Sequence, residues 1–89
     1  MGWKIEFDRA AEREIDKLDP QIARRILVLL HGRVAQLGDP RSIGEALKGS
    51  KLGEFWKYRV GDYRLICDIQ DRALRVLVVR IGNRQEVYK

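Results

Sequence analysis

The sequence is poor in the residues from which many catalytic centres are built. Its 89 residues contain one cysteine, Cys67, and one histidine, His31. One thiol and one imidazole cannot form a zinc site, and no disulfide can close within the chain. The chain also has no glycine-rich phosphate loop and no serine in a nucleophile elbow. We therefore expect no metal and no cofactor, with Cys67 a buried, unreactive thiol and His31 a surface side chain.

Long apolar runs are missing as well. The N-terminal stretch MGWKIEF lacks the apolar core of a signal peptide, and no run is long enough to span a membrane. The absence of paired cysteines fits a reducing compartment. The length suits one small domain, and neither an internal repeat nor a low-complexity segment is present. The sequence thus predicts a single domain, residues 1–89, that is cytoplasmic and makes no membrane contact.

Positive charge is concentrated in the second half of the chain. The formal net charge is +5 and the isoelectric point is about 9.7. Residues 1–47 carry eight basic and eight acidic side chains, whereas residues 48–89 carry ten basic and five acidic ones. This asymmetry indicates a polyanionic partner on the C-terminal half. Nucleic acid is the first candidate and an acidic protein the second, and the two are compatible.

The pattern of apolar residues predicts an α+β fold. Trp3 to Phe7 alternates as a short strand, and Asp8 offers an N-cap to a helix that extends to Leu18. Glu14 falls on the charged face of this helix, which we expect to be solvated. Asp19-Pro20 starts a second helix that runs to about Leu37 and is stopped by Gly38. The very short link between the helices predicts an antiparallel helix hairpin.

Three antiparallel strands forming a small twisted sheet are expected after a connector over residues 38–53. They cover residues 54–60, 63–70 and 73–81, and Asp71-Arg72 is a plausible turn between the last two. The third strand, ALRVLVVRI, is almost wholly apolar and therefore suits an inner position in the sheet.

Gly61-Asp62 predicts a tight type II′ turn between the first two of these strands. In the register that this turn sets, Arg59 faces Arg64. Lys57, Arg59 and Arg64 then share one face of the sheet, because side chains alternate with period two. The opposite face is expected to be core, with Trp56, Tyr58, Val60, Tyr63, Leu65 and Cys67. Two arginines directly opposite each other repel, so the basic face predicts a bound anion; the alternative is a solvated face with acids nearby.

The candidate functional residues are what remains after these exclusions. They are Lys57, Arg59, Arg64, Arg84 and Tyr88, with Lys48, Lys51 and Arg80 as further basic side chains nearby. Such a set suits phosphate binding and the stabilisation of charge in a transition state. It can bind nucleic acid, and it could cleave RNA, in which the 2′-hydroxyl supplies the nucleophile.

The order of elements and three motifs together resemble the RelE toxins of the RelE/ParE superfamily. The motifs are L-K-G at Leu47–Gly49, W-K-Y-R-V-G-D-Y-R-L at Trp56–Leu65 and I-G-N-R-Q-E-V-Y at Ile81–Tyr88. The resemblance covers essentially the whole chain and implies a RelE-like, microbial ribonuclease-type fold. It also implies a toxin that enters the A site of the 70S ribosome and cuts the mRNA there, and an acidic RelB-type antitoxin that wraps the toxin and blocks it.

By the same resemblance, roles fall on particular residues. Lys57 matches a catalytic strand lysine, Arg64 the arginine that holds the scissile phosphate, and Arg59 stands where some members have a second lysine. Arg84 matches a tail arginine near the leaving group, and Tyr88 a tail tyrosine near the attacking hydroxyl or its base. Arg59 stays protonated at neutral pH and cannot be the base, which leaves Lys57 or Tyr88 for that part. Asn83 stands where many relatives have His or Lys.

Two other functions are compatible with the same sequence. One is a ParE-like inhibitor of DNA gyrase, since the G-D-Y-R motif is shared across the superfamily. The other is a catalytically inert binding module whose basic face serves only an acidic partner. The cleavage constellation of basic strand, tail arginine and tail tyrosine favours the endoribonuclease.

Overall fold

The computed structural model describes residues 2–47 and 55–83. Within these ranges the strands are β1 (Lys4–Phe7), β2 (Glu45–Ala46), β3 (Trp56–Val60), β4 (Tyr63–Gln70) and β5 (Arg75–Asn83). The α-helices are α1 (Arg9–Asp16) and α2 (Pro20–Gly32), and short 3-10 turns cover Val34–Gln36, Pro40–Ser42 and Asp71–Ala73. The α+β class and the N-terminal strand are confirmed.

The sheet has five strands, in the order β1-β5-β4-β3-β2, rather than the expected three. β1 pairs in parallel with β5, while the other neighbouring strands are antiparallel. The two-residue strand β2 extends the far edge beside Trp56 and Lys57. β5 therefore lies between β1 and β4, which confirms the inner position expected for the apolar third segment.

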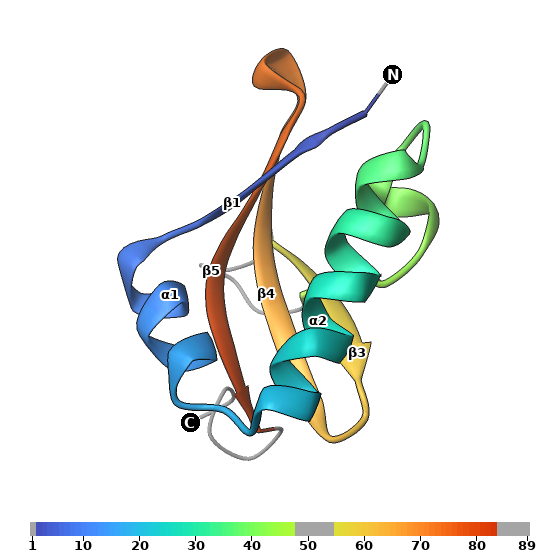
Figure 1. Ribbon diagram of the computed structural model, residues 1–89. Coiled ribbons are helices and arrows are strands. Elements are labelled where there is room, and N and C mark those ends of the chain that lie inside the picture. The colour runs from blue at the N-terminus through green and yellow to red at the C-terminus, as the bar shows by residue number, and fades with distance from the viewer. Residues whose placement is uncertain (1, 48–54, 84–89) are drawn as a thin grey trace.

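The two helices pack on the sheet and do not form the antiparallel helix hairpin that we expected. α1 lies beside β5, and α2 lies in front of β3 and β4 (Figure 1). Each helix buries its apolar side against strands rather than against the other helix, because the five-stranded sheet is wide enough to take both. One face of the sheet is thereby covered by α2.

The observed ends of the helices agree only in part with those predicted from the sequence. Asp19 caps α2 as expected, since Gln21 N donates to Asp19 Oδ1 at 2.9 Å. Asp8 occupies the N-cap position of α1, but its side chain makes no capping hydrogen bond. α1 ends at Asp16 rather than Leu18, and α2 ends at Gly32 rather than near Leu37. The helical spacing of apolar residues continues past Gly32, the end of α2, into a 3-10 turn in which Val34 is fully buried. The spacing therefore predicted a longer helix than the one that forms.

The turn at Gly61-Asp62 has the geometry that the sequence predicts. Gly61 has φ of +57°, and Leu74 is the only non-glycine residue in the described ranges with positive φ. Asp62 therefore keeps negative φ, as a type II′ turn requires. The observed register pairs Arg59 with Arg64 and Val60 with Tyr63, which confirms the expected pairing.

The hydrophobic core lies between α2 and the sheet. Tyr58, Val60, Leu65 and Cys67 belong to it, as expected for this face of β3 and β4, and Trp56 packs against it. The helices contribute Ala11, Ile26 and Leu30, and β5 contributes Val76, Val78 and Ile81. The core thus fixes which face of the hairpin is left for Lys57, Arg59 and Arg64.

The backbone at Gly44 passes very close to β3. A Cβ built on Gly44 would lie 2.5 Å from the carbonyl oxygen of Lys57 and 2.7 Å from Trp56 Nε1, and Gly44 has φ of +82°. Trp56 Nε1 donates to the carbonyl of Ile43 at 2.7 Å, and Tyr58 OH donates to that of Pro40 at 2.7 Å. The connector is therefore seated on β3 at a position that only glycine fits.

We predict that Gly44→Ala lowers the free energy of unfolding by about 2 kcal/mol or more, because the added methyl group meets backbone and the φ value is strained. Urea denaturation followed by tryptophan fluorescence measures this loss. Gly38→Ala is the matched control, since nothing lies within 4 Å of its Cβ. We expect Gly38→Ala to change stability by less than about 0.5 kcal/mol, and equal effects of the two substitutions would contradict the close approach.

Candidate anion-binding site

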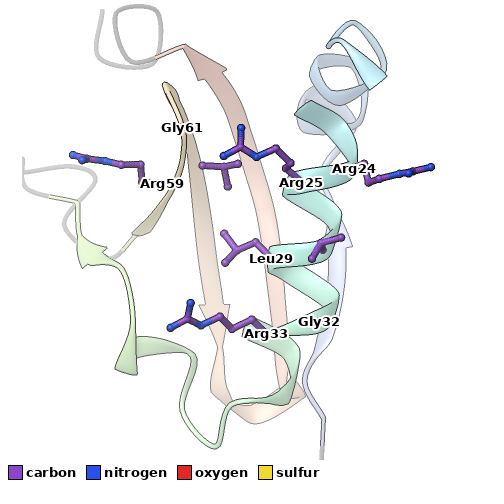
Figure 2. A pocket seen from close by; sticks show the side chains of 9 residues that line it. Arg24, Arg25, Leu29, Gly32, Arg33, Arg59 and Gly61 are labelled. Carbon is purple, nitrogen blue, oxygen red and sulfur yellow. The ribbon is translucent and has the colours of Figure 1, made fainter. Parts of the chain in front are cut away.

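The β3–β4 hairpin places Lys57, Arg59 and Arg64 on one face of the sheet, as the sequence predicts. Arg59 and Arg64 are directly opposite each other, next to the closing pair Val60 and Tyr63. A closing pair of a two-residue hairpin is hydrogen-bonded, so the next pair is of the non-hydrogen-bonded kind, with Cα atoms about 4.5 Å apart. Figure 2 shows Arg59 pointing away from α2. The basic side chains therefore lie on the face that α2 does not cover.

Arg64 is buried, which the sequence did not indicate. It is 5% exposed and is the one charged residue among the buried side chains of the described chain. Its cross-strand neighbours are Arg59 on β3 and Gly82 on β5, so one neighbour carries the same charge and the other has no side chain. Within residues 2–47 and 55–83, no carboxylate forms an ion pair with Arg64. A buried cation without a counter-charge is costly, and a bound anion would remove that cost.

Lys57 lies at the edge of this face and has an acidic neighbour. Its Nζ is 3.7 Å from Glu45 Oε2, and Glu45 is its partner across the β2–β3 pairing. The Glu45 side chain is largely exposed, whereas that of Lys57 is three-quarters buried. The short strand β2 thus brings a carboxylate to the border of the basic face.

The remaining candidate residues divide into one that the structure describes and four that it does not. Arg80 is paired across the strands with Ile66, on the same β4 face as Arg64, but its Nε lies 3.4 Å from Glu14 Oε2 on α1. It is therefore engaged in an ion pair with a helix rather than directed at Arg64. Lys48, Lys51, Arg84 and Tyr88 lie outside the described residues, so their placement stays a prediction.

Glu14 has a structural part that the sequence analysis missed, because we assigned it to a solvated helix face. Its Oε1 accepts a hydrogen bond from Ile81 N at 2.9 Å while Oε2 pairs with Arg80. The carboxylate thus accepts a backbone hydrogen bond from the edge of β5 at a point that β1 no longer covers. It holds β5 in place near its C-terminal end, a few residues before Arg84 and Tyr88 in the sequence. No periodicity in the sequence could show this, since it depends on where β1 stops.

Three other reactive side chains in the described ranges are Cys67, Tyr58 and His31. Cys67 is fully buried, as expected, and burial raises the pKa of its thiol. Burial likewise raises the pKa of the Tyr58 hydroxyl, which donates to Pro40. His31 is exposed, as expected. In the part of the chain that the structure describes, no three His, Cys, Asp or Glu side chains cluster as metal ligands. Its helices are too short or too polar to cross a membrane.

The α+β fold of this chain is shared with solved structures of toxins, one of them in a toxin–antitoxin complex. Residues 5–88 match the family described as the ParE toxin of the type II toxin–antitoxin system, parDE. The chain belongs to this RelE/ParE family of toxins. The resemblance inferred from the sequence motifs is thereby confirmed.

Individual relatives carry RelE-type names. The chain is 28% identical to Toxin RelG of Mycobacterium tuberculosis over 89 residues, which cover 100% of this chain and 99% of that protein. It is 26% identical to Toxin RelE of the same organism, covering 98% and 87%. The toxin–antitoxin complex RelBE2 of M. tuberculosis superposes with a TM-score of 0.83 at 26% identity, covering 94% and 93%. Isolated E. coli RelE shares the fold, with a TM-score of 0.72 at 23% identity, covering 97% and 90%.

We predict that Arg64→Met raises the free energy of unfolding by about 1–4 kcal/mol in buffer without phosphate, because it removes a buried charge and keeps the volume. The same change should abolish stabilisation by inorganic phosphate. For the wild-type protein, phosphate at one hundred times its Kd adds about 2.7 kcal/mol. Thermal unfolding in sodium phosphate and in sodium chloride of equal ionic strength measures both effects.

Arg72→Met is the matched control for this experiment. Arg72 is an exposed arginine in the turn between β4 and β5, away from the basic face. It should leave the phosphate-dependent shift of Tm intact. A shift that is as large in Arg64→Met as in the control would show that the buried arginine does not bind the anion.

Proposed function

We propose that this protein is a ribosome-dependent mRNA endoribonuclease that cuts in the A site and thereby stops translation. The observation that carries the proposal is Arg64, a buried cation that faces another arginine and has no ion-pair partner among the described residues. A phosphate diester is the anion that fits a basic face in a chain with this excess of positive charge. The RelG and RelE names of its relatives support the same activity.

In the proposed mechanism, Arg64 and Arg59 hold the scissile phosphate between them. Lys57 or Tyr88 takes the proton of the 2′-hydroxyl, whose oxygen attacks phosphorus in line. The bond to the 5′-oxygen breaks, Arg84 stabilises or protonates that leaving oxygen, and the products are a 2′,3′-cyclic phosphate and a 5′-hydroxyl. The step needs no metal and no cofactor, because the nucleophile belongs to the RNA and the arginines stabilise the added charge.

The site has strong charge stabilisation but no well-tuned acid–base pair. Arg59 and Arg64 stay protonated at neutral pH and cannot act as the base, and the Lys57 ammonium lies beside the Glu45 carboxylate. Such a centre should be slow on free RNA. Accurate positioning of the substrate can supply several kcal/mol of the barrier, which is the contribution we assign to the 70S ribosome.

The protein partner in this proposal is an acidic RelB-type antitoxin. The RelBE2 structure of M. tuberculosis, which superposes closely, is a toxin–antitoxin complex. An acidic partner also suits the net charge of +5. We propose that residues 1–89 act as one cytoplasmic toxin domain that this antitoxin holds inactive.

Inhibition of DNA gyrase is the second candidate function. It is favoured by the family match itself, whose description is that of a ParE toxin. A gyrase inhibitor on this fold has no need of arginines that hold a phosphate, so a buried Arg64 without an ion-pair partner among the described residues would be unexplained. An inert binding module would leave the same arginine unexplained.

We predict that the purified protein produces new cuts in the A-site codon of an mRNA held on programmed ribosomes, and none on free mRNA. Arg64→Ala and Tyr88→Ala should each reduce the cleavage rate by about 10²–10³, the usual effect of losing one group that stabilises a transition state. Primer extension measures the position and rate of cleavage. Arg72→Ala, an exposed arginine outside the basic face, should cleave at the wild-type rate.

Cleavage that survives both Arg64→Ala and Tyr88→Ala would rule out this catalytic scheme while leaving the nuclease activity in place. Absence of cuts with the wild-type protein would rule out the activity itself. A DNA supercoiling assay with gyrase then separates the two remaining candidates, since only a ParE-like protein inhibits it.

A further inference from the structure

A β-bulge interrupts β5 shortly before its end. Cys67 of β4 pairs with Val78, but the preceding residue, Ile66, pairs with Arg80. Val79 is therefore the extra residue that a bulge inserts into one of two paired strands. The alternation of side chains between the two faces of the sheet shifts by one residue at this point.

The bulge decides which residue β5 places beside Arg64. Val78 is the last core residue before the bulge, and Ile81 is the core residue after it. Unbroken alternation would have put Arg80 in the core and Ile81 on the basic face. With the bulge, Arg80 is half exposed and Gly82 lies directly opposite Arg64. The conformation of β5 after Val78 therefore shapes the candidate anion site.

The bulge also turns a different backbone N–H toward the edge of β5 that faces β1. Before the bulge, the carbonyl of Leu74 accepts a hydrogen bond from Lys4 N at 2.8 Å. The carbonyl of Val78 accepts one from Asp8 N at the same distance, so the even-numbered residues of β5 face β1. After the bulge it is the odd-numbered Ile81 whose N–H points to this edge, where the pairing with β1 has already ended. A backbone N–H inside a protein needs an acceptor, and no strand supplies one here.

Glu14 of α1 supplies that acceptor. Its Oε1 accepts from Ile81 N at 2.9 Å, and its Oε2 lies 3.4 Å from Arg80 Nε. Ala11, one turn earlier on α1, is fully buried, so the helix lies close against the sheet beside β5 (Figure 1). Residues three apart on a helix are neighbours, which brings Glu14 to the same strand. One carboxylate thus holds the two residues that follow the bulge.

We propose that Glu14 is a positioning residue for the cleavage of RNA, an inference that rests on the proposed function. It acts through Ile81, because the strand end that it holds is the one that places Gly82 opposite Arg64. β4 fixes this end on one side and the carboxylate fixes it on the other. In the sequence the same segment leads, three residues after Ile81, to Arg84. Since a misplacement of about 1 Å can lower a rate about 10²-fold, Glu14 contributes to the rate without contacting the RNA.

The test compares three variants of the full chain in mRNA cleavage on programmed ribosomes, with the protein in excess. Glu14→Ala should lower the maximal rate about tenfold or more. The protein concentration that gives half the maximal rate should change less than about twofold, because binding is not what Glu14 serves. Glu14→Gln keeps an oxygen for Ile81 N and should restore the maximal rate to within about threefold of wild type. Glu12→Ala is the matched control, an exposed glutamate on the same helix, and should cleave at the wild-type rate.

Hydrogen exchange of the Ile81 amide connects the rate to the contact. Exchange should become faster in Glu14→Ala and stay slow in Glu14→Gln and Glu12→Ala. All rates are measured well below the Tm of each variant, with amide spectra to verify the fold. A loss of stability alone then leaves the maximal rate unchanged.

Three outcomes would overturn the inference while the nuclease stands. They are an unchanged maximal rate in Glu14→Ala, failure of Glu14→Gln to restore the rate, and an effect on the half-maximal concentration alone. The last result would show that Glu14 only screens the charge of Arg80 from the RNA. Absence of cleavage by the wild-type protein would instead refute the proposed function, and the inference with it.

Discussion

The register of the β3–β4 hairpin is the constraint on which the rest of the molecule depends. Gly61, with φ of +57°, allows the two-residue turn, and the turn fixes Arg59 opposite Arg64. A slip of β4 by one residue relative to β3 would turn Arg64 into the core and bring Leu65 to the outer face. The energy that secures the register is therefore the burial of the core side chains, and the like-charge pair is held in place by it.

At one residue, Arg64, this arrangement lowers the stability of the fold. Tyr58, Val60, Leu65 and Cys67 stabilise the hairpin by packing under α2, whereas Arg64 on the reverse face is buried without an ion pair in the described chain. An apolar residue there would serve the fold better. The presence of arginine is understandable when the protein has an anionic ligand, because desolvation strengthens the attraction between the guanidinium and a bound phosphate.

The parts of the fold that depend on local pattern were predictable from the sequence. The Gly61-Asp62 turn, the facing pairs of the hairpin, the cap at Asp19 and the inner position of β5 all follow from short-range rules. The parallel pairing of β1, the two-residue strand β2 and the separation of the helices were missed, because they depend on which distant segment covers which edge. Burial of Arg64 and the bond from Ile81 to Glu14 were missed for the same reason.

The fold alone does not distinguish a nuclease from a gyrase inhibitor, because the family includes toxins described as ParE and relatives named RelE. The distinction has to come from the chemistry of the basic face. Recognition of a protein surface can be achieved with exposed arginines, whose charges cost little to keep in water. A phosphate that gains negative charge during a reaction is better stabilised by a desolvated cation. The attraction between the two then strengthens as the charge on the phosphate develops. Arg64 is buried and so meets the second condition, which is why the proposed nuclease function rests on it.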